Sequence, residues 1–143
     1  MASEPPADMH EFNRKIIEEF RANGGKVTGD FAGAPLLLLT TTGAKTGASR
    51  TTPLVYTQDG DNIVIIASYG GAPKHPAWFL NLRANPDITI EVGEEKFAAR
   101  ASVPEGEERK RLFDQQAAKM PGFADYQKKT TREIPAVVIE RVP

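Results

Sequence analysis

Apolar positions recur along this chain with two different periods, and each period predicts one kind of secondary structure. Near the amino end, Phe12, Ile16 and Phe20 follow one another at intervals of four residues. Such spacing places the three side chains on one face of a helix. The pattern predicts an amphipathic helix over residues 8–24, preceded by a loose polar tail over residues 1–7.

Six later segments show the alternation or the short apolar runs that are typical of β-strands. Residues 36–42 are apolar enough for a central strand, and Asp59-Gly60 marks a tight turn before a run rich in isoleucine and valine. Short turns between neighbouring runs favour an antiparallel barrel over alternating strand–helix units. The predicted strands cover residues 36–42, 51–57, 62–68, 88–92, 96–103 and 134–142.

Two helices are expected between these strands. One is a short amphipathic helix over residues 75–83, which is followed by an Asn-Pro pair. The other is expected to begin at a capping box formed by Ser102 and Glu105 and to fade near Met120, where Pro-Gly follows. Together these elements predict a single, mainly β domain over residues 8–143, built as an antiparallel barrel with flanking helices.

The composition narrows the function by what it excludes. The chain has 143 residues, no cysteine and a formal net charge of −1, so disulfides and thiolate chemistry are excluded and no basic footprint for nucleic acid exists. His10 and His75 do not form a recognisable metal-ligand pair, and no apolar run approaches the roughly 20 residues of a membrane-spanning helix. The polar amino end is unlike a signal peptide. We therefore expect a cytoplasmic protein without a metal site or a nucleic-acid partner.

The amphipathic helix over residues 8–24 has two interpretations. Its apolar face could lie on the inner face of a membrane, which would make the protein peripheral to that membrane. Alternatively, that face packs against its own domain. The polar face carries both acids and bases rather than a basic stripe, which favours packing against the domain.

The connection between the first two predicted strands carries the candidate chemistry. Residues 40–53 contain two glycines, seven hydroxyl side chains and the two cations Lys45 and Arg50. Glycine lets the backbone approach a ligand closely, and lysine and arginine attract anions. The segment therefore predicts a site for a large anionic cofactor that carries phosphate or carboxylate groups. An exposed hairpin loop with solvated cations is the alternative.

Two common nucleotide-binding motifs do not match this segment. A P-loop places glycine directly before lysine and then begins a helix. Here Ala44 separates Gly43 from Lys45, and a β-type run with Pro53 follows. No G-x-G-x-x-G motif occurs in the chain, so a Rossmann dinucleotide site is unsupported as well.

Several short motifs occur in a fixed order, and together they resemble the deazaflavin (F420)-dependent nitroreductase family, a group of small split-barrel reductases. The likeness runs from about residue 35 to the end of the chain. It rests on Leu-Thr-Thr-Thr-Gly-Ala-Lys-Thr-Gly over residues 39–47, Ala-Ser over 67–68, Pro-Ala-Trp-Phe-Leu-Asn-Leu over 76–82, Tyr-Gln over 126–127 and Ile-Pro-Ala-Val-Val over 134–138.

The resemblance implies a split antiparallel β-barrel, of the type that also binds FMN, with reduced coenzyme F420 as its hydride donor. This cofactor has a tricyclic ring, a phosphate-bearing arm and an oligoglutamate tail. By the resemblance, the cationic loop holds the acidic groups, and the end of the strand over residues 62–68 lies beside the ring. The implied cofactor-binding residues are Gly43, Lys45, Thr46, Gly47, Arg50, Thr51, Thr52, Pro53, Leu54, Ala67, Ser68, Tyr69, Ala77, Trp78 and Asn81. Relatives often carry lysine at the position of Tyr69.

Tyr126 and Ser68 are the candidate catalytic residues that the resemblance implies. Tyr126 lies in the segment that covers the acceptor site in relatives, where its hydroxyl would orient the acceptor or donate a proton, and a structural tyrosine is the alternative. Ser68 has an ordinary strand-end turn as its alternative, and Trp78 has a core position. His75, just before a proline, is expected to be a solvated helix entry.

The implied activity is hydride transfer to conjugated acceptors: quinones, coumarin and furanocoumarin lactones such as aflatoxins, and other enones. Met120 and Phe123 stand where nitroimidazole-reducing relatives carry tyrosines, which disfavours nitro groups. An FMN-dependent split-barrel oxidoreductase and a non-catalytic deazaflavin-binding protein are the alternatives. Because split barrels commonly pair to shield their edge strands, a homodimer is also expected.

Overall fold

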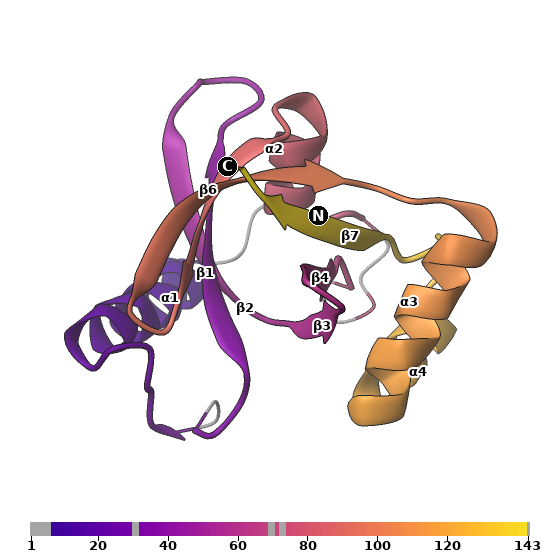
Figure 1. Ribbon diagram of the computed structural model, residues 1–143, viewed down its shortest axis with the longest axis horizontal. Coiled ribbons are helices and arrows are strands. Elements are labelled where there is room, and N and C mark those ends of the chain that lie inside the picture. Colours follow the sequence, from indigo (N-terminus) through magenta and orange to yellow (C-terminus); the bar gives the residue numbers. More distant parts are fainter. Residues whose placement is uncertain (1–6, 30–31, 69–70, 72–73, 143) are drawn as a thin grey trace.

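The strands form one curled antiparallel sheet that helices flank on several sides (Figure 1). The computed structural model describes residues 7–29, 32–68, 71 and 74–142, with side chains from residue 13 onward. Within these ranges the elements are α1 (Ala7–Ala22), β1 (Leu36–Thr42), β2 (Ser49–Val55), β3 (Thr57–Asp59), β4 (Asn62–Ile66), α2 (Ala77–Ala84), β5 (Asp87–Val92), β6 (Glu95–Ser102), α3 (Gly106–Lys119), α4 (Gly122–Lys128) and β7 (Ala136–Arg141).

The strand order explains why the sheet curls into a split barrel. The order is β2-β1-β5-β6-β7-β4-β3, and every pairing is antiparallel. The two edge strands of this order, β2 and β3, are separated in the chain by Tyr56 alone. Because the two edges are joined by one residue, the sheet must bend round until they meet. The predicted antiparallel barrel is therefore confirmed.

Two sequence expectations about elements were wrong. The single strand predicted over residues 51–57 is two strands, because β2 pairs with β1 whereas β3 pairs with β4 across the barrel. The predicted capping box does not exist: Ser102 ends β6 opposite Val138, and Glu105 precedes α3 without a side-chain capping bond. The helix expected to fade near Met120 does end there, since α3 stops at Lys119, but a further helix that the sequence did not predict, α4, begins directly behind Pro121.

The central strand β1 is buried on both faces, as its apolar run predicted. Leu37 and Leu39 join the main core inside the barrel, whereas Leu36 and Leu38 pack with Ile16 and Phe20 of α1. The apolar face of α1 is thus covered by its own sheet at these two positions, while the side chain of Phe12 lies outside the described residues. Among the helices that the structure describes, none has the length and apolar character needed to cross a membrane.

The end of α1 is fixed to the β5–β6 hairpin. The Gly25 amide donates to the Phe20 carbonyl at 2.8 Å, which closes the helix in the manner of a Schellman motif. A methyl group on Gly25 would lie 2.6 Å from the Gly93 Cα atom, so only glycine allows this approach. One turn earlier, Arg21 donates to both carboxylate oxygens of Glu91, at 3.0 and 2.8 Å. This ion pair holds α1 on the sheet.

Replacing Arg21 by methionine should lower the free energy of unfolding by about 2 kcal/mol at neutral pH, because Glu91 is largely buried and would lose its partner. The hydrogen bond from Arg21 holds the pKa of Glu91 below its ordinary value. A lowered pKa in the folded state stabilises above the ordinary pKa, about 4.3, and this contribution is lost as the pH falls through the lowered pKa. Urea unfolding at several pH values should therefore show that the stability difference between the wild type and the Arg21→Met variant becomes smaller in acid.

The control is the double-mutant cycle with Glu91→Gln. If the pair interacts as described, the double variant should lose less stability than the sum of the single losses. Additive losses, or a loss that does not change with pH, would contradict this account of the pair.

Candidate functional site

The β1–β2 hairpin ends in a tight loop beside α2 (Figure 1). The Gly43 amide donates to the Ala48 carbonyl at 2.7 Å, and the Gly47 amide donates to the Gly43 carbonyl at 2.9 Å. Gly47 has a φ of +73°, a value that glycine adopts without strain. A side chain at Gly43 would lie 2.9 Å from the Thr46 hydroxyl oxygen. The glycine spacing is thus what allows this loop conformation.

Asn81 of α2 holds the loop in place. Its side chain is buried; Oδ1 accepts from the Ala44 amide at 3.0 Å, and Nδ2 donates to the Thr41 hydroxyl at 3.3 Å. The side-chain amide of Asn81 therefore uses its oxygen as an acceptor and one N–H as a donor in bonds within the protein. This geometry makes Asn81 a residue that positions the predicted anion-binding loop.

The two cations of the loop remain available to a ligand. Lys45 and Arg50 are exposed, and neither forms a hydrogen bond or an ion pair with the described part of the chain. The amide N–H groups of Lys45 and Thr46 likewise have no acceptor there. Two cations and two free amide donors on one loop can bind phosphate or carboxylate groups.

The strand register separates the predicted β2 residues into two groups. Arg50 stands opposite Thr41, and directly opposed residues of an antiparallel pair point to the same face. Arg50, Thr52 and Leu54 consequently share the barrel-side face. Thr51 and Pro53 point to the other face, where the Thr51 hydroxyl lies 2.9 Å from that of Thr40. The predicted contacts of Thr51 and Pro53 with a cofactor on the barrel side would have to use backbone atoms.

A second part of the candidate site lies where β4 ends. Ala67 packs in the same core cluster as Trp78, and its amide donates to the Pro135 carbonyl at 2.9 Å. The side chain of Trp78 is 8% exposed, so this residue mainly serves the core, whereas Ala77 is half-buried. Ser68 is nearly buried, and Tyr69 lies outside the described residues.

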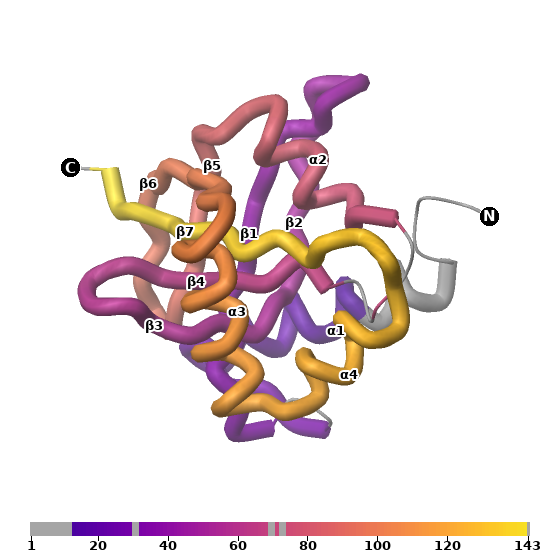
Figure 2. The backbone as a smooth tube through the Cα atoms, turned by 90° about the vertical axis from the view of Figure 1, so that its right-hand side faces the viewer, coloured from indigo at the N-terminus to yellow at the C-terminus, as the bar shows by residue number. Residues whose placement is uncertain are grey.

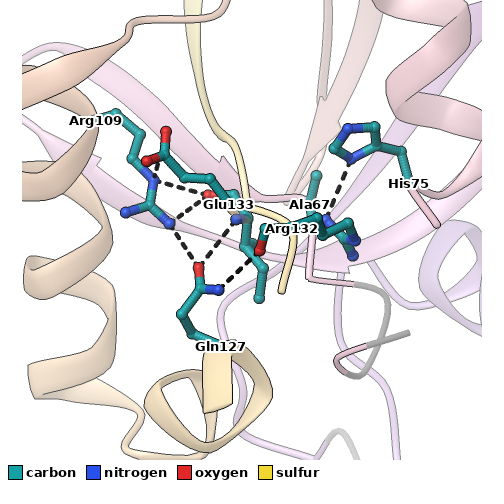
Figure 3. Close-up of polar contacts among 7 residues, drawn as sticks. Ala67, His75, Arg109, Gln127, Arg132 and Glu133 are labelled. Carbon is teal, nitrogen blue, oxygen red and sulfur yellow. Dashed lines mark hydrogen bonds and ion pairs between the residues drawn. The ribbon is translucent and has the colours of Figure 1, made fainter. Parts of the chain in front are cut away.

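Arg132 contacts this strand end from the loop before β7 (Figure 3). Its guanidinium donates to the Ala67 carbonyl at 3.2 Å and to the Ser68 carbonyl at 2.8 Å. It also lies 3.2 Å from Nδ1 of His75, at the start of α2. One side chain therefore connects the end of β4 to the beginning of α2.

His75 is not the solvated helix entry that the sequence predicted. It is half-buried, and its ring lies 4.8 Å from that of Phe79. Burial lowers the pKa of His75, and the nearby charges of Arg132 and Arg83 lower it further. The imidazole is therefore neutral at neutral pH, and Nδ1 can accept from Arg132.

The helix α4 closes one side of the β4–α2 connection. A methyl group on Gly71 would lie 2.7 Å from the Tyr126 carbonyl oxygen, so the two backbones are in close contact. The ring of Tyr126 is half-buried and meets that of Phe123 edge-on, with 5.4 Å between their centroids. Both rings pack against the cluster that contains Ile66 of β4. Tyr126 thus lies near the strand end, as the sequence-based hypothesis requires.

A network of polar groups fixes α4 to its neighbours (Figure 3). Oε1 of Gln127 accepts from Arg109 at 2.9 Å and from the Ile134 amide at 3.0 Å. Nε2 of Gln127 donates to the Arg132 carbonyl at 2.8 Å. Arg109 donates to the Ile134 carbonyl as well, at 2.9 and 2.7 Å. In Figures 1 and 2, α3 and α4 lie side by side as one layer that this network anchors.

The helix α2 links the two parts of the site. His75, just before α2, faces Arg132 and the β4 end, and Asn81, within the helix, faces the β1–β2 loop. Within the described ranges, no three acidic or histidine side chains gather where they could hold a metal ion. Sequence reasoning missed Arg132 and Arg109, since no local pattern shows which carbonyl groups a distant arginine will contact.

Comparison with known proteins gives the chain a family. The family model described as F420H(2)-dependent quinone reductase matches residues 12–141. The F420H(2)-dependent quinone reductase Rv1261c of Mycobacterium tuberculosis is 42% identical over 126 residues, which cover 85% of each chain. The chain belongs to the F420H(2)-dependent quinone reductase family.

Two solved structures support this assignment. An F420-H2 dependent reductase, FDR-A, is 39% identical with a TM-score of 0.68, and the match covers 74% of this chain and 94% of that one. A structure described as a domain-swapped dimer is 35% identical with a TM-score of 0.70, and the match covers 95% of this chain and all of the other. The split-barrel fold is thereby confirmed.

Membership of this F420H(2)-dependent quinone reductase family confirms three sequence predictions: the reductase family resemblance, an oxidoreductase and reduced F420 as its cofactor. The family description also makes quinone reduction the activity.

Gly71→Ala tests the contact between the β4–α2 connection and α4. Gly71 has a φ of +82°, and the added methyl group would strike the Tyr126 backbone. Gly60→Ala is the matched control, because Gly60 has a φ of +62° but open space around it. Overpacking should make the Gly71 variant less stable than the control by about 1–3 kcal/mol in urea unfolding. Equal losses would mean that α4 does not press on this connection.

Proposed function

We propose that this chain transfers a hydride from reduced F420 to quinones and to related flat, conjugated acceptors such as coumarin and furanocoumarin lactones. The observation that carries the proposal is the β1–β2 loop. Asn81 pins it against α2, while its two cations and two amide donors have no partner in the described part of the chain. A loop of this kind suits a cofactor with a phosphate and an acidic tail.

The donor set fits the cofactor in its chemistry. Lys45 and Arg50 would bind the phosphate and nearby carboxylates, with the free amides of Lys45 and Thr46 as further donors. Ser68 and Ala77 would lie along the ring, and Thr52 and Leu54 would extend the barrel-side wall. Tight packing around Gly43 leaves no room for a side chain there, which supports a loop shaped for close backbone contact.

The chain's own residues then have to orient the acceptor and exclude water. When bound, reduced F420 supplies the hydride, and a quinone that gains this hydride and one proton becomes a hydroquinone. The hydroxyl of Tyr126 would orient the acceptor carbonyl or donate the proton, and solvent is the alternative proton source. The half-buried rings of Tyr126 and Phe123 would form an apolar wall for a flat acceptor.

A binding and turnover experiment separates the proposed enzyme from its alternatives. The purified chain should quench F420 fluorescence on titration and should speed oxidation of reduced F420 by menadione. Binding of F420 without faster oxidation would identify a non-catalytic carrier. Tight binding of FMN with no response to F420 would contradict the proposal and favour an FMN oxidoreductase.

We further propose that the chain forms a homodimer. The support is the related structure described as a domain-swapped dimer, together with the two sheet edges that β2 and β3 present.

Reversing both loop charges tests the cofactor site. The variant Lys45→Glu/Arg50→Glu should bind F420 at least about tenfold more weakly, because each lost charge-assisted hydrogen bond is worth about 1.5 kcal/mol or more. The control Lys15→Glu/Lys26→Glu changes the net charge equally at exposed positions outside the loop. Equal affinities of the loop variant and the wild type in fluorescence titrations would refute the assignment of this loop.

Acceptor preference depends on the residues around α4. Met120 and Phe123 are both half-buried, and neither offers a strong donor to a nitro group. The variant Met120→Tyr/Phe123→Tyr should shift the ratio of nitroimidazole to quinone turnover about fivefold, which corresponds to one net hydrogen bond of about 1 kcal/mol. Met120→Phe, which adds a ring without a hydroxyl, should leave the ratio unchanged. An unchanged ratio in the double variant would count against this wall.

A further inference from the structure

The guanidinium of Arg132 donates to backbone carbonyl groups at the end of β4, where the cofactor ring is proposed to lie. It donates to the carbonyl groups of Ala67 and Ser68, the two residues that follow β4, and it contacts His75 just before α2. Two segments that enter the site from different directions are therefore held by one planar group (Figure 3).

These contacts decide which backbone groups a ligand can reach. With both carbonyls engaged, the acceptors at the strand end are already satisfied. The amide and the hydroxyl of Ser68, by contrast, have no partner in the described part of the chain. The strand end thus offers an N–H donor and a hydroxyl that can donate or accept, and two such donors suit a ligand edge that carries oxygen atoms.

Arg132 is itself held by the α4 layer. Its carbonyl accepts from Gln127 at 2.8 Å, and its amide donates to the Thr130 hydroxyl at 3.3 Å. Gln127 directly follows Tyr126, the proposed acceptor-orienting residue. A displacement of Arg132 would therefore move the donor edge at Ser68 relative to the ring of Tyr126.

We propose that Arg132 is a positioning residue for the reductase reaction. It fixes Ser68, whose amide and hydroxyl would contact the ligand, relative to α4, and it thus sets the position of the ligand relative to the rings of Phe123 and Tyr126. The inference rests on the proposed function. It requires arginine, because one planar fork reaches two carbonyls and a ring nitrogen together, whereas a lysine ammonium is a single point donor.

The test compares Arg132→Met and Arg132→Lys with the control Arg100→Met. Arg100 is exposed and pairs with Asp87 on the β5–β6 hairpin, so its loss should leave turnover unchanged. Circular dichroism and thermal unfolding show which variants fold, and menadione reduction gives kcat and KM. Both Arg132 variants should lose about ten- to a hundredfold in kcat/KM, since misplacement by about 1 Å has effects of that size. Part of the loss should appear in kcat.

An NMR titration of His75 in a His10→Gln background tests the contact between Arg132 and His75 independently of turnover. The charges that lower the pKa of His75 are those of Arg132 and Arg83. Removing one of them in Arg132→Met should raise the pKa of His75 towards its ordinary value. Arg132→Lys keeps the charge, so the pKa should stay low while kcat/KM still falls. That combination would identify loss of geometry, not of charge, as the cause.

Other outcomes would contradict the positioning role of Arg132. A folded Arg132→Lys with wild-type kcat and KM would overturn the positioning role, and it would leave the proposed function intact. If Arg132→Met does not fold, the lysine variant alone decides in the same way. A wild-type chain that neither binds F420 nor reduces menadione would overturn the proposed function and this inference together.

Discussion

The burial of one face of α2 in the curled sheet is the constraint on which both parts of the candidate site depend. Trp78, Phe79 and Leu82 of α2 join the main core cluster with buried residues from five strands. With this face fixed, Asn81 contacts the β1–β2 hairpin, and His75 contacts Arg132 at the end of β4. The core thus sets the distance between the β1–β2 loop and the end of β4, the two parts of the candidate site. Apolar core residues that take no part in the reaction therefore set the geometry of the candidate site.

The second support is polar and surrounds the segment before β7. Arg109 and Gln127 satisfy carbonyl and amide groups of the segment before β7, where the chain has no regular structure to pair them. Arg132, which belongs to that segment, donates to the carbonyls of Ala67 and Ser68 at the end of β4. Such a network couples α3, α4, β7 and the end of β4. Since the cofactor supplies the difficult chemistry in this family, the protein's contribution is orientation and exclusion of water. A rigid frame around the cofactor is what such a division of labour requires.

Patterns of local origin were read correctly from the sequence. The antiparallel hairpins follow from short turns between β-type runs. The strand β1 was identified as central because it begins with four consecutive leucines. One failure was non-local, and another came from a local ambiguity. The break at Tyr56 arises because β2 and β3 pair with strands on different sides of the barrel, and no residue there signals it. The helix α4 was missed because Pro121 ends one helix and equally well begins the next.

By itself, the sequence determined the family, the β-rich domain and the cationic, glycine-rich loop, because these depend on residue types and on spacings within a few positions. The tertiary structure alone decided how the candidate residues are used. It assigned Asn81 to holding the loop and Trp78 to the core, and it brought Arg132 to His75, 57 positions away. A hydrogen bond depends on distances of about 3 Å between atoms. Only the folded chain sets those distances for residues so far apart in sequence.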